Sequence, residues 1–188
     1  MVFILPILFL VTMGAVGQEL EKAPKQYSFE LGYRYMLSNE LVNGGGTHGA
    51  GFLLDYAWQL SGYTPERNAV YLSVPIGYAI IPDGSGGSGQ RMLHYGWTVR
   101  HMIGKEKKMH PFMGYALLLN QVSSDDRDGQ LFGHQTRFAF GVNLNSGGFT
   151  TPYIAMEYSM ARHPQFDAES SWLHFVELKT GLRFQRAR

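Results

Sequence analysis

Residues 170–188 read SSWLHFVELKTGLRFQRAR, and within them apolar side chains alternate with charged or small ones. Successive side chains of a β-strand point to opposite faces of its sheet, so this stretch predicts a strand with one apolar and one ionic face. The fold depends on which of the two faces meets water. The apolar set is Val176, Leu178, Leu182 and Phe184, and the opposite set is Glu177, Lys179, Gly181 and Arg183.

The composition excludes several classes of protein. The chain has 188 residues, of which 45% are hydrophobic and 16% charged, and its formal net charge is +1. This length fits a single domain, and the near-neutral charge argues against a nucleic-acid partner. Because no cysteine is present, the chain has no disulfide, no thiolate nucleophile and no Cys-ligated metal site.

The first residues predict an exported protein. An apolar run over residues 2–16 ends at Ala15 and Val16, and Gly17 follows it. Ala15 and Gly17 are small residues at the two positions that a signal peptidase reads. The run is shorter than the roughly 20 residues that a membrane-spanning helix needs, and Pro6 interrupts it. We therefore expect residues 1–17 to be a cleaved signal peptide and residues 18–188 to form one domain.

The period-two pattern of the last strand recurs along the mature chain. Short stretches rich in Gly, Asn, Asp, Ser or Pro, the residues that turns require, separate the segments in which apolar and polar residues alternate. An even number of long strands with short connections predicts an antiparallel up-and-down meander that closes on itself and so has no sheet edge. The eight predicted strands cover residues 27–38, 49–61, 69–81, 91–103, 111–122, 131–144, 152–163 and 172–184.

Side-chain volume decides which face of this barrel points inward. The apolar face carries many large aromatic groups, such as Tyr33, Trp97 and Phe140, whereas the other face is rich in Gly and Ala. The interior of an eight-stranded barrel is only wide enough to be filled by side chains. The aromatic face is therefore expected to point outward, toward lipid. The predicted fold class is all-β, an eight-stranded antiparallel up-and-down transmembrane β-barrel with a polar filled lumen.

The inward face then holds four acids and five bases, which can pair and hydrogen-bond as buried charges must. On the lipid side, each mid-membrane Arg or Lys would instead cost about 2–4 kcal/mol. We expect these nine residues to form a lumen ion network. They are Glu30, Arg34, Asp55, Arg100, Arg137, Glu157, Glu177, Lys179 and Arg183.

Over the whole mature chain, these features resemble the small eight-stranded bacterial outer-membrane β-barrel proteins. The outward residues of the last strand look like the C-terminal assembly signal of that family, with Phe184 as its aromatic residue. The chain departs from the family in the QRAR that follows Phe184 and in Pro75 within the third strand, whose missing N–H must fall at a bulge or an unpaired position. The resemblance implies a Gram-negative outer-membrane location, insertion by the barrel assembly machinery, contact with outer-membrane lipid and lipopolysaccharide, and a monomeric state.

We expect a structural or envelope-associated role without an open pore, because the connections are short and the lumen is filled. Two alternatives remain. One is a lipid A-modifying enzyme, an acyl hydrolase or acyltransferase, and the other is a secreted soluble barrel of the lipocalin type.

The enzymatic alternative depends on polar residues of the seventh predicted strand. Glu157, Ser159 and His163 share its inward face, and His94 is a candidate to meet His163 near the outer mouth. Residues four apart in a strand are about 13 Å apart, so Ser159 cannot hydrogen-bond His163 directly. The close His-x-Ser spacing of the deacylase barrels is missing as well, since Gln165 stands at that position. We therefore expect a structural role for these side chains.

The histidines are scattered over both faces without the spacing of a metal site, so neither a metal ion nor a cofactor is expected.

Overall fold

All eight predicted strands are present, and each begins and ends within two residues of its predicted bounds. The computed structural model describes residues 25–39, 48–60, 69–82, 89–103, 109–124, 130–144, 149–163 and 171–185. The predicted signal peptide, residues 1–17, lies outside the described residues. The strands are β1 (Lys25–Asn39), β2 (His48–Gln59), β3 (Val70–Ile81), β4 (Gln90–Met102), β5 (Met109–Ser124), β6 (Gln130–Leu144), β7 (Thr150–His163) and β8 (Ser171–Gln185).

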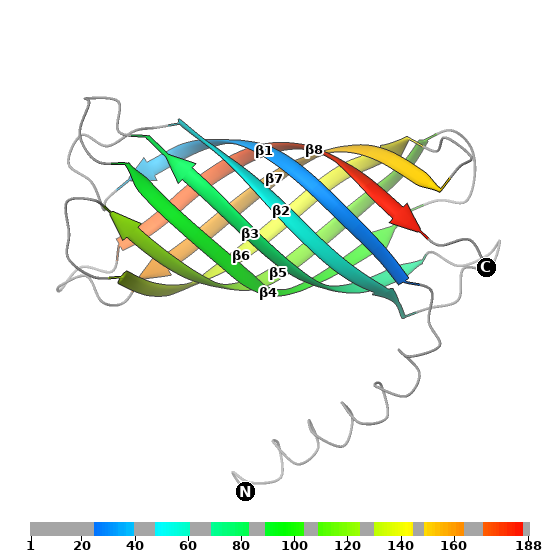
Figure 1. Ribbon diagram of the computed structural model, residues 1–188, viewed down its shortest axis with the longest axis horizontal. Helices are drawn as coiled ribbons and strands as arrows, with labels where there is room; N and C mark the ends of the chain where they lie inside the picture. Colours follow the sequence, from blue (N-terminus) through cyan, green and yellow to red (C-terminus); the bar gives the residue numbers. More distant parts are fainter. Residues whose placement is uncertain are drawn as a thin grey trace, which may run out of the picture.

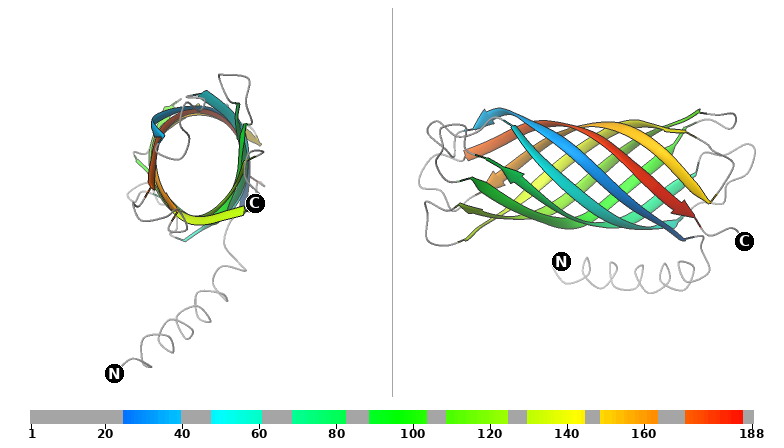
Figure 2. Two further views of the ribbon diagram at one scale, coloured as in Figure 1. Left: turned by 90° about the vertical axis from the view of Figure 1, so that its left-hand side faces the viewer. Right: turned by 45° about the horizontal axis from the view of Figure 1, so that its top comes forward.

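The strands form one closed barrel in sequence order (Figures 1 and 2). Each strand is antiparallel to its neighbours, and β1 pairs with β8 from Gln26 opposite Gln185 to Asn39 opposite Leu173. The predicted fold class is thereby confirmed. The end at which β1 begins and β8 finishes is called the terminal end below, and the opposite end is called the far end.

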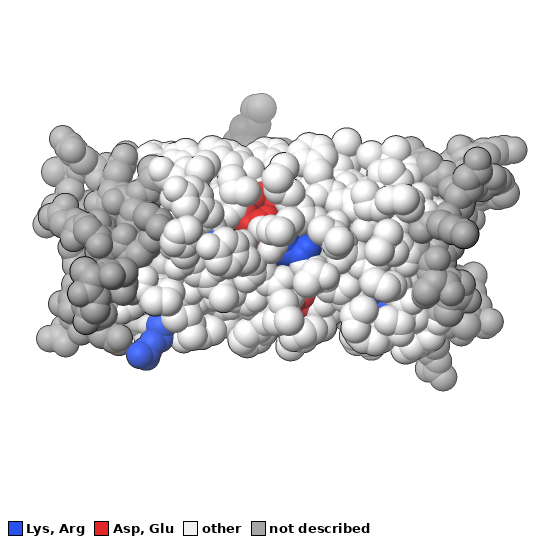
Figure 3. Space-filling model, turned by 90° about the horizontal axis from the view of Figure 1, so that it is seen from above, with Lys and Arg blue, Asp and Glu red and all other residues white. Residues whose placement is uncertain are grey.

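The two faces of every strand differ in burial as the alternation predicts. Phe140 and Leu178 point outward and are 59% and 58% exposed, whereas Lys179, next in the chain to Leu178, is only 2% exposed. In Figure 3, one face of the outer wall is seen to be almost wholly uncharged, with small blue and red areas between the white ones. Large apolar side chains therefore cover the outside of the barrel, and charged side chains fill its inside.

Glycines on the inward face leave room for the large side chains opposite them. A Cβ atom at Gly32 would run into the carboxylate of Glu177, and one at Gly77 would run into the imidazole ring of His94. The Gly and Ala residues that signal an inward face in the sequence therefore serve to accommodate its few long polar groups.

Pro75 lies in the middle of β3, where it is buried and pairs with Asp55 of β2. On the other side of β3, the ladder with β4 is interrupted at Pro75. Ser73 pairs with Thr98, the next pair is Ile76 with Tyr95, and no pair lies between them. A proline has no N–H to donate to a ladder, so it is accommodated at an unpaired position of a strand. The unpaired position expected from the sequence is found here.

The interior is layered along the barrel. Near the far end, apolar side chains from β1, β3, β4, β5, β7 and β8 pack together, and near the terminal end lie two smaller apolar clusters. Charged and polar side chains occupy the length between these layers. The far-end layer consists of Met36, Ala79, Ile81, Met92, Val122, Ala161, Leu173 and Phe175, and the terminal-end clusters contain Ala57, Ala69 and Tyr71, and Phe112, Tyr153 and Ala155.

Candidate functional site

All nine charged residues expected in the lumen lie inside the barrel, and none of them is more than 8% exposed. They come from six strands, so no single segment of the chain carries the site. They are Glu30 and Arg34 of β1, Asp55 of β2, Arg100 of β4, Arg137 of β6, Glu157 of β7, and Glu177, Lys179 and Arg183 of β8.

Arg34 and Glu177 form an ion pair across the seam between β1 and β8. They are direct cross-strand neighbours, and the guanidinium donates to the same carboxylate oxygen, Oε2, from Nη2 at 2.9 Å and from Nε at 3.3 Å. The guanidinium also lies 4.4 Å from the ring centroid of Phe175 and 3.3 Å from the sulfur of Met92. Arg34 therefore joins the ionic layer to the apolar layer at the far end.

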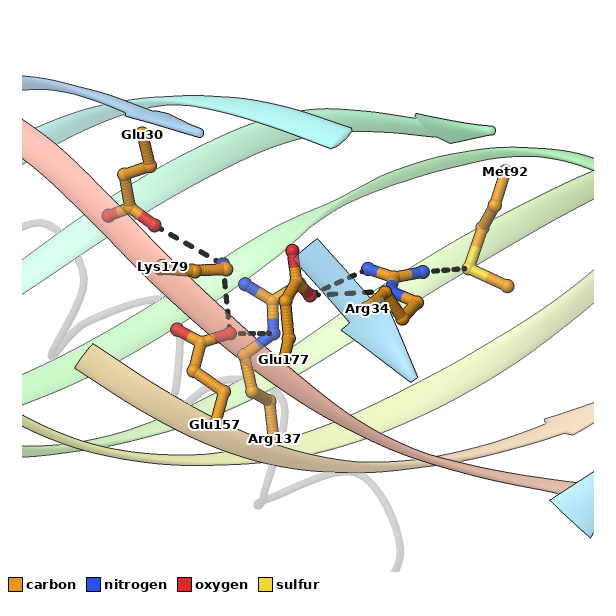
Figure 4. Close-up of polar contacts among 7 residues, drawn as sticks. All are labelled: Glu30, Arg34, Met92, Arg137, Glu157, Glu177 and Lys179. Carbon is orange, nitrogen blue, oxygen red and sulfur yellow. Dashed lines mark hydrogen bonds and ion pairs between the residues drawn. The ribbon is translucent and has the colours of Figure 1, made fainter. Parts of the chain in front are cut away.

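Lys179 is the centre of a second group of charges (Figure 4). Its Nζ atom lies 3.2 Å from Oε2 of Glu30 and 2.8 Å from Oε2 of Glu157. The same oxygen of Glu157 lies 3.2 Å from Nε of Arg137. This group links β1, β6, β7 and β8 at mid-barrel, and with the Arg34–Glu177 pair it is called the central ion network below.

The remaining charged residues lie closer to the terminal end. Arg100 lies 3.8 Å from a carboxylate oxygen of Asp55 and donates a hydrogen bond to the side chain of Gln26. Arg183 donates to the amide oxygen of Asn143. Its guanidinium lies 3.7 Å from the ring centroid of Tyr153 and 4.2 Å from that of Phe112, so two aromatic rings hold it.

A small cavity of about 30 Å³ separates these two groups of charges, with Glu30, Asp55, Arg100, Arg137, Glu157 and Arg183 in its lining. A space of this size holds one or two water molecules. Waters there would hydrate the charges that line this space.

The apolar layers inside the barrel are not predicted from the sequence. Their residues occupy the same alternate, inward-facing positions of the strands as the polar residues do, so alternation does not separate the two kinds. In β8, Phe175 lies two positions before Glu177, and in β7, Tyr153 lies four positions before Glu157. Each therefore has the even spacing that places it on the inward face. Both are almost fully buried. The lumen is therefore polar at its centre and apolar toward both ends.

Among the described residues, the enzymatic candidates Glu157, Ser159 and His94 are not hydrogen-bonded to one another. Glu157 is engaged by Arg137 and Lys179, and Ser159 is fully buried. Among the described residues, neither the hydroxyl of Ser159 nor the ring of His94 has a hydrogen-bond partner, so the two are not bonded to each other. His163 ends β7, and its side chain lies outside the described part of the structure.

No group of three or more His, Asp or Glu side chains within the eight described segments is arranged to hold a metal ion. In the same segments, no helix is long and apolar enough to cross a bilayer.

Phe184 lies near the terminal end of β8, opposite Tyr27 of β1. Its ring centroid is 6.0 Å from that of Phe149, and its side chain is partly exposed. Its use as an assembly signal stays a prediction.

Comparison with known proteins identifies the fold. A scan of the sequence against family models finds no match, and a search of curated proteins finds none either. Among solved structures, Neisserial surface protein A aligns over 86% of this chain and 97% of its own, with 12% sequence identity and a TM-score of 0.61. Ail, the attachment invasion locus protein of Yersinia pestis, aligns over 87% and 99%, with 10% identity and a TM-score of 0.53.

A third structure, the outer membrane enzyme PagL, aligns over 83% of this chain and 97% of its own, with 13% identity and a TM-score of 0.54. The same barrel thus carries different activities, so the likeness defines the fold. This chain has the fold of the small eight-stranded outer-membrane β-barrels.

Proposed function

We propose that this chain is an outer-membrane protein with a structural or envelope-associated role, and that its barrel does not form an open pore. One observation carries the second part of this proposal. Inward side chains fill the lumen along its length, as an apolar layer at the far end, the central ion network, and aromatic groups around Arg183 at the terminal end.

The outer wall supports a membrane location. Outward side chains such as Leu31, Leu117 and Phe140 are more than half exposed, and such an apolar surface needs lipid around it. Cleavage after Gly17, delivery to the barrel assembly machinery and recognition of Phe184 belong to the same proposal. A monomer satisfies it, because the closed barrel has no free strand edge.

Planar-bilayer recording of the refolded mature chain tests the absence of a pore. The expected trace shows no steady conductance, whereas a stable open channel in the wild-type protein would contradict the proposal. A porin of about 16 strands, recorded under the same conditions, serves as the positive control because a barrel of that size leaves an aqueous channel.

The enzymatic alternative is tested by mass spectrometry of lipid A from cells with and without the protein. We expect identical spectra, since Ser159 and His94 are enclosed in the lumen away from the lipid-facing wall. A shift by one acyl chain would show lipid A modification and would be followed with Ser159→Ala and His163→Ala. A mature chain that stayed soluble without detergent would instead favour the lipocalin-like alternative.

A further inference from the structure

Charged side chains on the outer wall follow a simple rule in the described residues. The four described acids, Glu30, Asp55, Glu157 and Glu177, all point inward. The outward charges are all basic, and each lies within two residues of a strand end. They are Lys25 at the terminal end, and Arg91 and Arg162 at the far end. The ends of the wall can therefore attract anions, and its middle is left to acyl chains.

One of these cations belongs to a cluster. Arg162 of β7 is the direct cross-strand neighbour of His134 of β6 and of Trp172 of β8. Its guanidinium carbon lies 5.7 Å from the Trp172 ring centroid. His174 is the next outward residue after Trp172, with the ring centroids 6.3 Å apart. His134, Arg162, Trp172 and His174 are called the far-end basic patch below.

The patch is supported from the side nearer the middle of the wall. The Nδ1 atom of His174 is 2.8 Å from the hydroxyl of Tyr158, which fixes the imidazole against β7. A guanidinium stacked on an indole keeps its edge N–H groups available for a phosphate oxygen. Tryptophan and tyrosine prefer the boundary between lipid and water. The patch therefore has the chemistry of a headgroup site at the edge of a membrane.

An acyl-chain surface continues from the patch along the same strands. Nearer the middle of the barrel than Tyr158 lie the outward side chains of Met156 and Leu178, which are direct cross-strand neighbours and are 57% and 58% exposed. A lipid with its headgroup on the patch would thus place its chains on apolar side chains. The donors of the patch span three strands, which is about 10 Å, and this width suits a sugar headgroup with phosphates better than a single phosphodiester.

We infer that the far-end basic patch binds the phosphorylated sugar headgroup of a glycolipid of the lipid A type. This inference rests on the proposed function, because it requires the barrel to span a membrane with its far end in the leaflet that contains such a lipid. Arg162 donates to the phosphate, Trp172 holds Arg162 and stacks on the sugar, and the two histidines widen the site.

The experiment uses the full mature chain in phosphatidylcholine nanodiscs that contain a limiting amount of bisphosphorylated lipid A. Lipid retained by each barrel is counted by native mass spectrometry. Arg162→Gln is compared with Arg91→Gln, which removes a cation at the same end, and with Lys25→Gln, which removes one at the other end. Dephosphorylated lipid A and phosphatidylglycerol serve as the two comparison lipids.

Arg162→Gln should lower the apparent affinity for lipid A about tenfold, as the loss of a charge-assisted hydrogen bond does, while the other two variants retain the wild-type value. Dephosphorylated lipid A should bind the wild type about as weakly. An equal loss in all three variants, or no loss in any, would overturn the inference. Phosphatidylglycerol binding with the same affinity and the same dependence on Arg162 would overturn the assignment to a glycolipid.

A separate readout distinguishes this inference from the proposed function. The shift in gel mobility between unheated and heated samples reports whether each variant is folded in the nanodisc. A folded, inserted and non-conducting barrel that shows no effect of Arg162→Gln would contradict only the lipid site. A chain that fails to enter the nanodisc would contradict both.

Discussion

Arg34 and Glu177 face each other across the seam that closes the barrel, with Nη2 of the guanidinium 2.9 Å from Oε2 of the carboxylate. Both side chains are almost fully buried, so neither charge has water to replace its partner. Removing one partner should therefore cost much more than removing both.

Glu177→Leu leaves the Arg34 guanidinium buried without its carboxylate, and we expect it to lower the free energy of unfolding by about 3–5 kcal/mol. The double variant Arg34→Met with Glu177→Leu leaves no unpaired charge and should recover most of that loss. Urea unfolding in detergent micelles measures both. If the double variant were as unstable as the single one, packing and not charge would account for the effect.

Lys179→Met removes the cation shared by Glu30 and Glu157. Glu157 keeps Arg137, whereas Lys179 is the one ion-pair partner of Glu30 among the described residues, so we expect a loss of about 3 kcal/mol. Leu178→Met is the matched control, because Leu178 is the adjacent outward residue and surface changes usually stay within about 0.5 kcal/mol. Equal effects of the two changes would show that Lys179 is not held in a buried network.

Leu178 and Met109 test whether the outer wall meets lipid, because both are 58% exposed but lie at different depths. Leu178 is in the middle of β8, and Met109 is the first residue of β5. In a bilayer, Leu178→Arg should cost about 2–4 kcal/mol and Met109→Arg about 0–1 kcal/mol. Folding titrations in lipid vesicles measure the difference. Similar costs at the two positions would indicate that no hydrocarbon surrounds the wall.

Phe175 anchors the apolar layer at the far end and stacks on Arg34. Phe175→Ala should lower stability by about 3–5 kcal/mol through the cavity that it leaves. Phe175→Leu keeps most of the volume and should cost less than about 1.5 kcal/mol. The same unfolding assay compares the two variants, and a small effect of the alanine change would mean that the layer repacks.

Much of the fold could be predicted because apolar and polar side chains alternate every two residues. This repeat identifies the strands and also shows which side chains of each strand point inward. Leu178 and Lys179 are neighbours in the chain, yet one lies on the outer wall and the other in the lumen, and parity alone assigns them. Pro75 also gave a correct prediction, since its missing N–H requires an unpaired position.

The partners inside the lumen could not be predicted in the same way, because parity says which face a residue occupies but gives no register between strands. Lys179 has Glu157 and Glu30 as its partners only because of the way that β7 and β1 align with β8. Likewise, Phe175 and Tyr153 share the inward parity with the charges, so alternation alone does not separate apolar from polar layers. The far-end basic patch brings together three strands, and its pairing depends on register too.

The seam between β1 and β8 joins the first described strand to the last, and its ion pairs link residues 143 and 149 positions apart in the chain. Contacts of such long sequence separation form late and close slowly. Until β8 arrives, Arg34 and Glu30 lack the partners that the finished barrel gives them. Without β8 the sheet would therefore have both an open edge and uncompensated charges on its inward face, so closure of the barrel and neutralisation of its interior occur in one step.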